Sequence, residues 1–493
     1  MRQFILNFVN NNKDYPFIAG LSSGVYALLY LYDKNFTLVN SWNQFIVFVL
    51  SFCIAPGLLT LLLYKLFEAI TWLKAYKKYV IPVLNLVFFL VYIVLVTQGF
   101  HKKKLMLSVV IIALVLGVLL YKYIKKIIVF QLLLSCFLIA KLIPSLYNVL
   151  TYSYNWQDLE DDITEVQFAE KPNIYYLQPD GYVGFKEMKT GYYNHNNDEF
   201  QSFLQHKKFK IYNNFRSNYT STLTSNSSMF SMKHHYYGAD QNHDEQYNAR
   251  SIIAGNNAVI DILQHNNYKT NLILDVPYLL VNRPTMNYDY CNINYNDIPY
   301  LTRGFGFEKD TKNDLFYAIE QNKKSNNFYF VRQPKPGHIS TTKSQSRGKE
   351  EERNVYLEDL KTSNNWLKEI VVGIEDRDPN AMIIILSDHG GFVGFDFTRQ
   401  SKTKGNDADL VTSMFSSLFA VKWPQNDAVN YDENLKSSIN VFRVVFSYLS
   451  KNKRYLEHLE QDESVAIISE GASPGVYELI DNDEEVVFNK FTD

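Results

Sequence analysis

The residues most able to do chemistry come at the ends of short apolar runs that are typical of buried strands. Asp180 closes one such run, His338 follows a second, and the adjacent pair Asp388 and His389 follows a third. Carboxylate oxygens and imidazole nitrogens are ligands of Zn²⁺ and Mn²⁺, and such an ion makes a bound hydroxyl a nucleophile at neutral pH. The pattern therefore predicts a centre for a divalent metal ion, Zn or Mn.

The signal is strongest in the segment Ile-Ile-Ile-Leu-Ser-Asp388-His389-Gly-Gly. A buried strand that ends in two ligand-type residues and then two glycines is an unusual combination. By contrast, the pair Asp180 and Gly181 is typical of a turn, and a hydroxyl-rich stretch such as residues 218–230 is typical of a helix cap. Those two segments are evidence for a metal site only in combination with the segment that contains Asp388 and His389.

The chain after residue 150 alternates short apolar runs with longer amphipathic ones. The expected strands cover residues 174–177, 271–274, 328–331, 382–386 and 418–421, and the expected helices cover residues 257–264, 311–321, 351–374 and 433–449. Strands that alternate with helices indicate an α/β domain with a mainly parallel central sheet covered on both faces. Because functional residues of such sheets gather beyond the carboxyl ends of the strands, we expect the site at that edge.

The first third of the chain is rich in Leu, Ile, Val, Phe and Tyr. Crossing about 30 Å of hydrocarbon takes about 20 mainly apolar residues in a helix. Five segments approach that length, namely residues 17–32, 45–67, 79–100, 105–121 and 127–147. These segments predict a transmembrane anchor of five helices at residues 1–150, followed by an acidic linker at residues 151–171 and the α/β domain at residues 172–493.

The loops that carry lysine indicate the orientation, because such loops tend to stay in the cytoplasm. Lysines lie within residues 74–78 and 122–126, whereas the segment after the last span is acidic at residues 158–162. A loop of the opposite set also carries lysines, at residues 102–104. The balance favours a multi-pass protein of the cytoplasmic membrane with its catalytic domain on the periplasmic or extracellular side. The spans hold almost no ionisable groups, which favours an anchor over a transporter.

The charge balance argues against a nucleic-acid partner. The chain has a formal net charge of −2 at pH 7, and no cluster of Lys and Arg stands out after residue 150. Nucleic-acid phosphates are bound by a clustered excess of cationic side chains. Binding to nucleic acid is therefore not expected.

The order of the site motifs resembles the sulfatase-like branch of the alkaline phosphatase superfamily. A strand-ending Asp, a hydroxyl-rich turn, a strand-ending His and a final Ser-Asp-His-Gly follow one another between residues 173 and 424. Five N-terminal spans before such a domain look like lipid A phosphoethanolamine transferases and lipoteichoic acid synthases. The resemblance implies that Asp180, Asp388 and His389 hold the metal ion.

The same resemblance implies a threonine nucleophile. Residues 228–231, Ser-Met-Phe-Ser, are similar to the Cys-Met-Phe-Ser of the phosphoethanolamine transferases. Counting back from them places the nucleophile at Thr222, which would also be a metal ligand. Thr220, Ser221 and Thr224 stay open as alternatives, because a small shift in the comparison would exchange them.

Three histidines are implied or suggested as substrate contacts. The resemblance places His338 where a histidine contacts the substrate phosphate or the leaving group. His234 and His235 follow the nucleophile segment closely and are candidates to line the substrate pocket. Residues 332–337 lack the Asp that two-metal members of the superfamily carry, so a single ion is expected rather than two.

These features predict a membrane-anchored, metal-dependent phosphoryl-group transferase or phosphodiester hydrolase. Its expected partners are the bilayer, a phospholipid headgroup and an envelope glycan or lipid acceptor. One alternative is a sulfatase, although none of Cys53, Cys136 and Cys291 lies in the Cys-x-Pro-x-Arg setting of sulfatases. Another is a catalytically inactive envelope protein that uses the same fold for binding.

Overall fold

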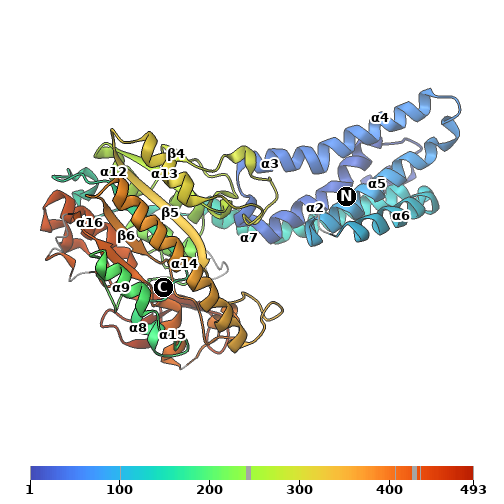
Figure 1. Ribbon diagram of the computed structural model, residues 1–493. Coiled ribbons are helices and arrows are strands. Elements are labelled where there is room, and N and C mark those ends of the chain that lie inside the picture. Colours follow the sequence, from blue (N-terminus) through green and yellow to red (C-terminus); the bar gives the residue numbers. More distant parts are fainter. Residues whose placement is uncertain are drawn as a thin grey trace. The chain divides into compact units, whose positions relative to one another are not determined.

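The computed structural model describes residues 2–99, 102–239, 246–405, 407–424, 430–432 and 435–491. The chain divides into two compact units, Met1–Tyr152 and Ser153–Asp493. Figure 1 shows that the first unit is built from helices alone and that the second surrounds a sheet with helices.

The first unit contains seven α-helices within the described residues. They are α1 (Arg2–Asn10), α2 (Pro16–Val39), α3 (Trp42–Val49), α4 (Ala55–Ala69), α5 (Lys77–Gln98), α6 (Lys103–Leu119) and α7 (Ile124–Thr151). Within the described residues, three helical stretches are long and apolar enough to cross a membrane. These are Trp42–Ala69, which joins α3 to α4, Lys74–Gln98 and Tyr121–Thr151.

Two of the five predicted spans are not among these three. Residues 105–121 lie mainly in α6, a helix of 17 residues that falls short of the length of a full span. Residues 17–32 lie in α2, a helix of 24 residues that continues through the charged Asp33 and Lys34. Phe100, the end of the predicted third span, lies outside the described residues.

Small residues bring α2 close to the stretch Trp42–Ala69. A Cβ atom on Gly24 would lie 1.6 Å from the carbonyl oxygen of Phe52, and one on Gly20 would lie 2.3 Å from that of Pro56. Gly20 and Gly24 are about one helical turn apart, so both face the same neighbour. The two glycines therefore allow a backbone approach that larger side chains would block.

A buried amide pair joins α5 to α7. Asn85 donates to Gln131 Oε1 at 2.9 Å, and Gln131 donates back to Asn85 Oδ1 at 2.9 Å. Ser22 of α2 donates to the same Gln131 oxygen at 3.1 Å. Because these polar groups satisfy one another, they can be buried among apolar helices and link α2, α5 and α7.

The second unit is organised around a sheet with strand order β2-β7-β6-β1-β5-β3-β4, which has seven strands in the part of the chain that is described. The strands are β1 (Ile174–Asp180), β2 (Lys210–Ile211), β3 (Tyr268–Leu274), β4 (Tyr290–Cys291), β5 (Asn326–Pro336), β6 (Met382–Leu386) and β7 (Phe419–Lys422). The pairs from β6 to β4 are parallel, whereas β7 is antiparallel to both β6 and β2. The prediction of an α/β domain with a mainly parallel sheet is confirmed.

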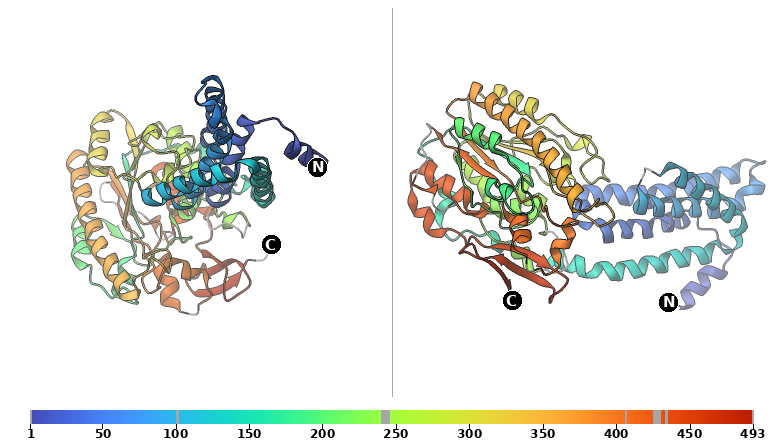
Figure 2. Two further views of the ribbon diagram at one scale, coloured as in Figure 1. Left: turned by 90° about the vertical axis from the view of Figure 1, so that its right-hand side faces the viewer. Right: turned by 60° about the horizontal axis from the view of Figure 1, so that its bottom comes forward.

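Helices cover both faces of this sheet. They are α8 (Phe185–Lys189), α9 (Asp198–His206), α10 (Thr222–Ser231), α11 (Ala249–Ala254), α12 (Ala258–His265), α13 (Thr311–Gln321), α14 (Lys349–Arg377), α15 (Ala408–Phe415) and α16 (Val441–Ser450). Alternate residues of β1 point to opposite faces, so Tyr175 packs in the core that includes α13 and α14, and Tyr176 in the core that includes α10 and α16. Figure 2 shows the helices on the two sides of the sheet. The predicted helix at residues 433–449 begins outside the described residues.

A small antiparallel sheet follows near the C-terminus. It contains β8 (Ser464–Ile468), β9 (Gly475–Ile480) and β10 (Val486–Lys490). This sheet was not among the predicted elements. The backbone N–H of Val465 in β8 donates to the carbonyl oxygen of Asn218 at 2.9 Å. The small sheet therefore supports the segment that leads into α10.

Candidate active site

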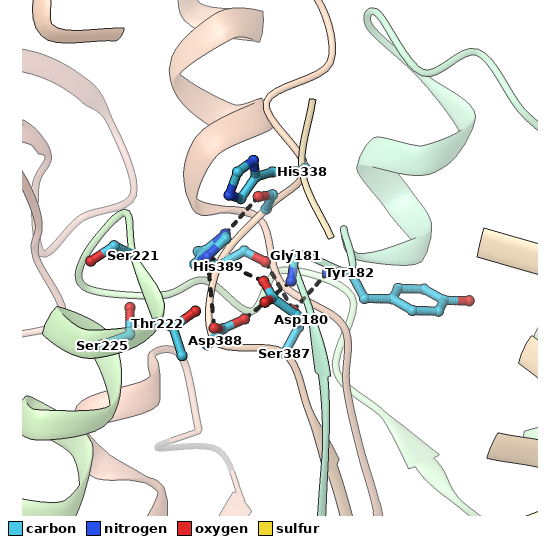
Figure 3. A network of polar contacts seen from close by, with 12 residues as sticks. Asp180, Gly181, Tyr182, Ser221, Thr222, Ser225, His338, Ser387, Asp388 and His389 are labelled. Atoms are coloured by element: carbon cyan, nitrogen blue, oxygen red, sulfur yellow. Dashed lines mark hydrogen bonds and ion pairs between the residues drawn. The ribbon is translucent and has the colours of Figure 1, made fainter. Parts of the chain in front are cut away.

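The carboxyl edge of the large sheet brings together the three predicted metal ligands. Asp180 is the last residue of β1, and Asp388 and His389 follow β6, which is the parallel neighbour of β1. One donor atom from each of the three residues lies within 4.8 Å of the other two. Figure 3 shows the three side chains converging at the end of these strands.

Each of the three side chains is held by the protein through one polar atom. Its second polar atom faces the point where the three side chains converge. Gly181 donates its backbone N–H to Asp388 Oδ1 at 3.1 Å, and Arg332 pairs with Asp180 Oδ2. His389 Nδ1 lies 2.8 Å from the carbonyl oxygen of Gly390. Since a carbonyl only accepts, this contact places the proton on Nδ1 and leaves the lone pair on Nε2.

The remaining atoms form the candidate metal centre. His389 Nε2 lies 3.5 Å from Asp180 Oδ1 and 3.7 Å from Asp388 Oδ2. Neither carboxylate oxygen has a hydrogen-bond partner among the described residues, although both are buried. Ligands about 2 Å from a tetrahedral ion stand roughly 3.3–3.5 Å apart. The donor set, its spacing and its unsatisfied oxygens therefore fit a divalent ion.

The two carboxyl groups have opposite pKa shifts. Burial raises the pKa of Asp180, and the negative charge of Asp388 raises it further. Burial also opposes ionisation of Asp388, but His389, Arg332 and the Thr222 hydroxyl outweigh it and hold its pKa below the usual value. Two carboxyl groups this close resist simultaneous ionisation, and a divalent cation would remove that conflict.

Thr222 is the first residue of α10 and is buried next to this group. Its Oγ1 atom lies 3.4 Å from Arg332 Nη2, and Figure 3 shows it on the side of the helix that faces Asp388. Ser221 instead caps the helix, with its Oγ accepting from the Thr224 backbone N–H, and it lies 2.8 Å from the Thr224 hydroxyl. The geometry therefore favours Thr222 over Ser221 and Thr224 as the nucleophile. Thr220 is half-buried and precedes the helix cap.

His338 is exposed on the loop after β5, near the metal-ligand group. Its ring centroid lies 6.0 Å from that of His389. The adjacent Gly337 donates its N–H to the Asp180 carbonyl oxygen at 2.8 Å, and Gly181, with a φ of +62°, has no room for a side chain beside Gly337. This close contact of two turns places His338 beside the end of β1.

His234 and His235 have partners within the protein on both ring nitrogens. His234 contacts the Tyr219 hydroxyl at 3.1 Å and the Gln461 carbonyl oxygen at 2.9 Å. His235 contacts the Thr224 carbonyl oxygen at 3.0 Å and accepts from the Tyr237 N–H at 2.9 Å. Both histidines are buried, so the structure places them as supports of α10 rather than in an open pocket.

Two charged residues at the same edge of the sheet were not among the predicted site residues. Arg332 lies in β5 between β1 and β3, is 2 % exposed, and contacts both Asp180 and Thr222. Asp275 comes directly after β3 and is also buried. Their signal was a lone charge at the end of an apolar run, Phe-Tyr-Phe-Val-Arg332 and Asn-Leu-Ile-Leu-Asp275.

No family model and no curated protein matches this chain. Several solved structures match. The lipooligosaccharide phosphoethanolamine transferase A from Neisseria meningitidis is 13% identical, with 88% of this chain and 95% of that chain covered and a TM-score of 0.41. The zinc complex of the C-terminal periplasmic domain of EcEptC from Escherichia coli is 14% identical, with 66% and 95% covered and a TM-score of 0.41. The lipoteichoic acid synthase LtaP from Listeria monocytogenes is 14% identical, with 66% and 91% covered and a TM-score of 0.43.

Proposed function

We propose that this protein is a membrane-anchored, metal-dependent phosphoryl-group transferase or phosphodiester hydrolase with Thr222 as its nucleophile. The observation that carries the proposal is the arrangement of Asp180, Asp388 and His389, whose free donor atoms face one point beside the Thr222 hydroxyl. The sequence resemblance supplies the reaction class. A single divalent ion, Zn or Mn, is held by these three side chains and by Thr222.

The ion would supply two effects. When bound, it lowers the pKa of the hydroxyl beside it and offsets negative charge on the phosphoryl group. The rest of the reaction depends on the side chains of the chain itself. Arg332 is buried, keeps Asp180 oriented and reaches toward Thr222, so its positive charge is placed to bind the oxygens of the transferring group.

In the first step the Thr222 hydroxyl releases its proton to solvent, and its Oγ1 atom attacks phosphorus. A bond forms between Thr222 and phosphorus as the bond from phosphorus to the leaving oxygen breaks. His338 donates a proton from Nε2 to that oxygen, because Nδ1 is occupied by the Ile339 carbonyl oxygen at 2.7 Å. The product of this step is a phosphorylated threonine.

In the second step an acceptor alcohol or water approaches the phosphorylated Thr222. Nε2 of His338 takes the proton of the incoming hydroxyl, whose oxygen forms the new bond to phosphorus. The bond from Thr222 to phosphorus breaks, and Thr222 Oγ1 regains a proton from solvent. An alcohol acceptor makes the protein a transferase, and water makes it a hydrolase.

The anchor agrees with a substrate that lies in the membrane. We propose five spans within residues 1–150, a linker at residues 151–171 and a catalytic domain at residues 172–493 on the periplasmic or extracellular side of the cytoplasmic membrane. Three helical stretches of the described chain have the length and apolar character of spans. A tethered site near headgroups raises the effective concentration of a phospholipid donor and of a lipid or glycan acceptor.

The test uses the full-length protein in nanodiscs with Zn²⁺, a phospholipid labelled in its headgroup and a lipid or glycan acceptor. Mass spectrometry of the products separates labelled acceptor, which indicates transfer, from free headgroup, which indicates hydrolysis. Peptide mapping of protein stopped early in the reaction is expected to show the added mass on Thr222.

The Thr222→Ala variant is the matched control. The proposal fails if this variant forms product at the wild-type rate, or if the added mass lies on another residue. Turnover of an aryl sulfate without turnover of any phosphodiester would favour the sulfatase alternative. Zn²⁺ bound without turnover of either would favour a binding protein.

A further inference from the structure

The segment that directly follows α7 in the sequence contacts a support of the nucleophile helix α10. After α7 ends at Thr151, a short 3₁₀ helix covers Asn155–Gln157. The half-buried indole of Trp156 in this helix meets the imidazole of His235, with ring centroids 5.5 Å apart and ring planes at 80°. His235 is one of the two buried histidines that support α10. Trp156 is therefore linked to α10 through a single side chain.

A buried salt bridge fixes the position of this segment. Arg443 of α16 donates to both carboxylate oxygens of Asp161, at 2.7 and 3.2 Å. The two side chains are 3 % and 7 % exposed, so water and salt screen the pair only weakly. Ile163 is fully buried in the core that includes α10 and α16. Trp156 thus comes shortly before a stretch of chain that is firmly bound to the second unit.

The hydrogen bonds of His235 define its protonation state. Its Nδ1 accepts the Tyr237 N–H at 2.9 Å, so the proton lies on Nε2, which donates to the Thr224 carbonyl oxygen at 3.0 Å. Burial lowers the pKa of His235 to about 3, so the ring is neutral at physiological pH. Thr224 lies in the first turn of α10, which Thr222 begins. The imidazole therefore holds the backbone of the turn that carries the nucleophile.

Two aromatic side chains restrain the His235 ring. The Tyr219 ring stacks on it, with centroids 4.1 Å apart and planes at 22°, and the Tyr219 hydroxyl accepts the His235 backbone N–H at 3.1 Å. Tyr219 is fully buried, whereas Trp156 is half-buried, so loss of the indole would open His235 to water. Water competes for the bond from Nε2 to Thr224, because that bond is stronger in a dry environment.

The orientation of the first turn of α10 decides where the nucleophile points. The Oγ1 atom of Thr222 lies 3.4 Å from Arg332 Nη2, beside the metal-ligand group. A misplacement of about 1 Å at a reacting group can lower a rate by about 100-fold. We propose that Trp156 is a positioning residue, which holds this turn in its reactive orientation through His235. The inference rests on the proposed function, in which Thr222 is the nucleophile.

Steady-state kinetics of the full-length, zinc-loaded protein in nanodiscs tests this inference, with the labelled phospholipid and acceptor described above. Trp156→Ala is expected to lower kcat by about 10-fold or more and to change KM by less than about 2-fold, because the substrate contacts remain. Its zinc content should equal that of the wild type, since Asp180, Asp388 and His389 do not lie on α10. Trp156→Phe keeps a ring beside His235 and should retain kcat within about 3-fold of the wild type.

A double-mutant cycle shows whether Trp156 acts through His235. His235→Ala is expected to lower kcat at least as much as Trp156→Ala, and the double variant should lose little more than His235→Ala alone. Trp156→Leu keeps an apolar contact without the flat ring and should lose more kcat than Trp156→Phe. It replaces Trp156→Ala in the cycle if that variant unfolds.

Trp366→Ala is the matched control. Trp366 is a half-buried tryptophan of α14 that packs against the core on the other face of the sheet from α10, and its indole donates to the Thr311 hydroxyl at 3.1 Å. This variant is expected to lower the Tm and to leave kcat unchanged. It separates a general loss of stability from a change at the nucleophile.

A wild-type kcat in Trp156→Ala would overturn the inference and leave the proposed function intact. An equal loss of kcat in Trp366→Ala would also overturn it, because the loss would then follow from stability alone. The same conclusion would follow if the effects of Trp156→Ala and His235→Ala simply multiplied in the double variant. Absence of turnover in the wild type would count against the proposed function, and the inference would fail with it.

Discussion

His389 Nε2 lies 3.5 Å from Asp180 Oδ1, although the two residues are far apart in the sequence. The parallel register of β1 with β6 brings them together, because both residues come at the carboxyl ends of adjacent strands. The free lone pair of the imidazole faces a carboxylate oxygen that has no hydrogen-bond partner in the described residues. Such an arrangement needs a cation, and the first prediction follows from it.

Asp388→Asn and His389→Ala are expected to lose the bound metal ion. Each change removes one of the four proposed protein donors, and the loss of affinity should exceed the roughly 10- to 100-fold that follows from removing an outer-shell partner. Metal content of the purified protein, measured by mass spectrometry after dialysis against Zn²⁺, checks the result. Asp297→Asn serves as the control, and metal retained by His389→Ala would contradict the assignment.

Thr222→Ala is expected to lower turnover by about 10⁴-fold or more, because the nucleophile is removed. Ser221→Ala should instead lower the free energy of unfolding by about 1 kcal/mol, since Ser221 caps α10, and should retain most activity. Thermal unfolding and turnover of both variants distinguish the two roles. Strong inactivation of Ser221→Ala with wild-type stability would move the nucleophile to Ser221.

Arg332→Met is expected to destabilise the metal-free protein by about 3–5 kcal/mol, because it leaves the buried Asp180 carboxyl without its cation. Zn²⁺ should reduce this difference, since the ion supplies the missing positive charge. Unfolding curves with and without Zn²⁺ measure both quantities. Arg332→Lys keeps the charge, so its free energy of unfolding should lie between those of the wild type and Arg332→Met. An equal loss of stability in Arg332→Met with and without Zn²⁺ would show that Arg332 acts through packing.

Glu187 of α8 gives a prediction of pH dependence. Burial raises the pKa of Glu187 from 4.5 to about 7, with a smaller contribution from Asp409. Folding therefore favours the protonated form of Glu187. The contribution of this group to the stability of the folded protein is full below about pH 4.5 and is lost as the pH rises through 7. Between those limits the wild type should lose up to about 3 kcal/mol relative to Glu187→Gln.

The measurement for Glu187 is the difference in melting temperature between the wild type and Glu187→Gln from pH 5 to pH 8.5. Comparing the two proteins at each pH cancels the other titrating groups. The melting temperature of Glu187→Gln should rise relative to that of the wild type as the pH rises. A difference that is constant with pH would mean that Glu187 is ionised throughout.

The central sheet and the metal-ligand group were predictable because they follow from local sequence patterns. Short apolar runs marked the strands, and the strand-end rule placed Asp180, Asp388 and His389 at one edge. Thr222 could be named only through the resemblance, since a run of hydroxyl residues does not reveal which one caps the helix. The structure separates Thr222 from Ser221 by their hydrogen bonds.

The features that were missed depend on lateral neighbours. Arg332 and Asp275 become parts of the site through the register of β3, β5 and β1, which the sequence does not display. Likewise, the partners of His234 and His235 come from Tyr219 and distant loops, and the pairing of β8 to β10 forms a separate sheet. Three of the five predicted spans coincide with apolar helices of membrane length in the described chain, whereas the other two stay predictions because α6 is short and α2 carries charges.

The paired amides of Asn85 and Gln131 have a consequence for how the helical unit assembles. Lipid tails solvate every face of an apolar helix almost equally well. Apolar contacts alone therefore do not determine how α5 and α7 are rotated about their axes relative to each other. A reciprocal bond between two carboxamides forms at only one azimuth and one vertical offset. The two residues thus fix the relative alignment of α5 and α7. In a newly inserted bundle that has not yet formed this pair, the side-chain amide protons of Asn85 would be accessible to exchange.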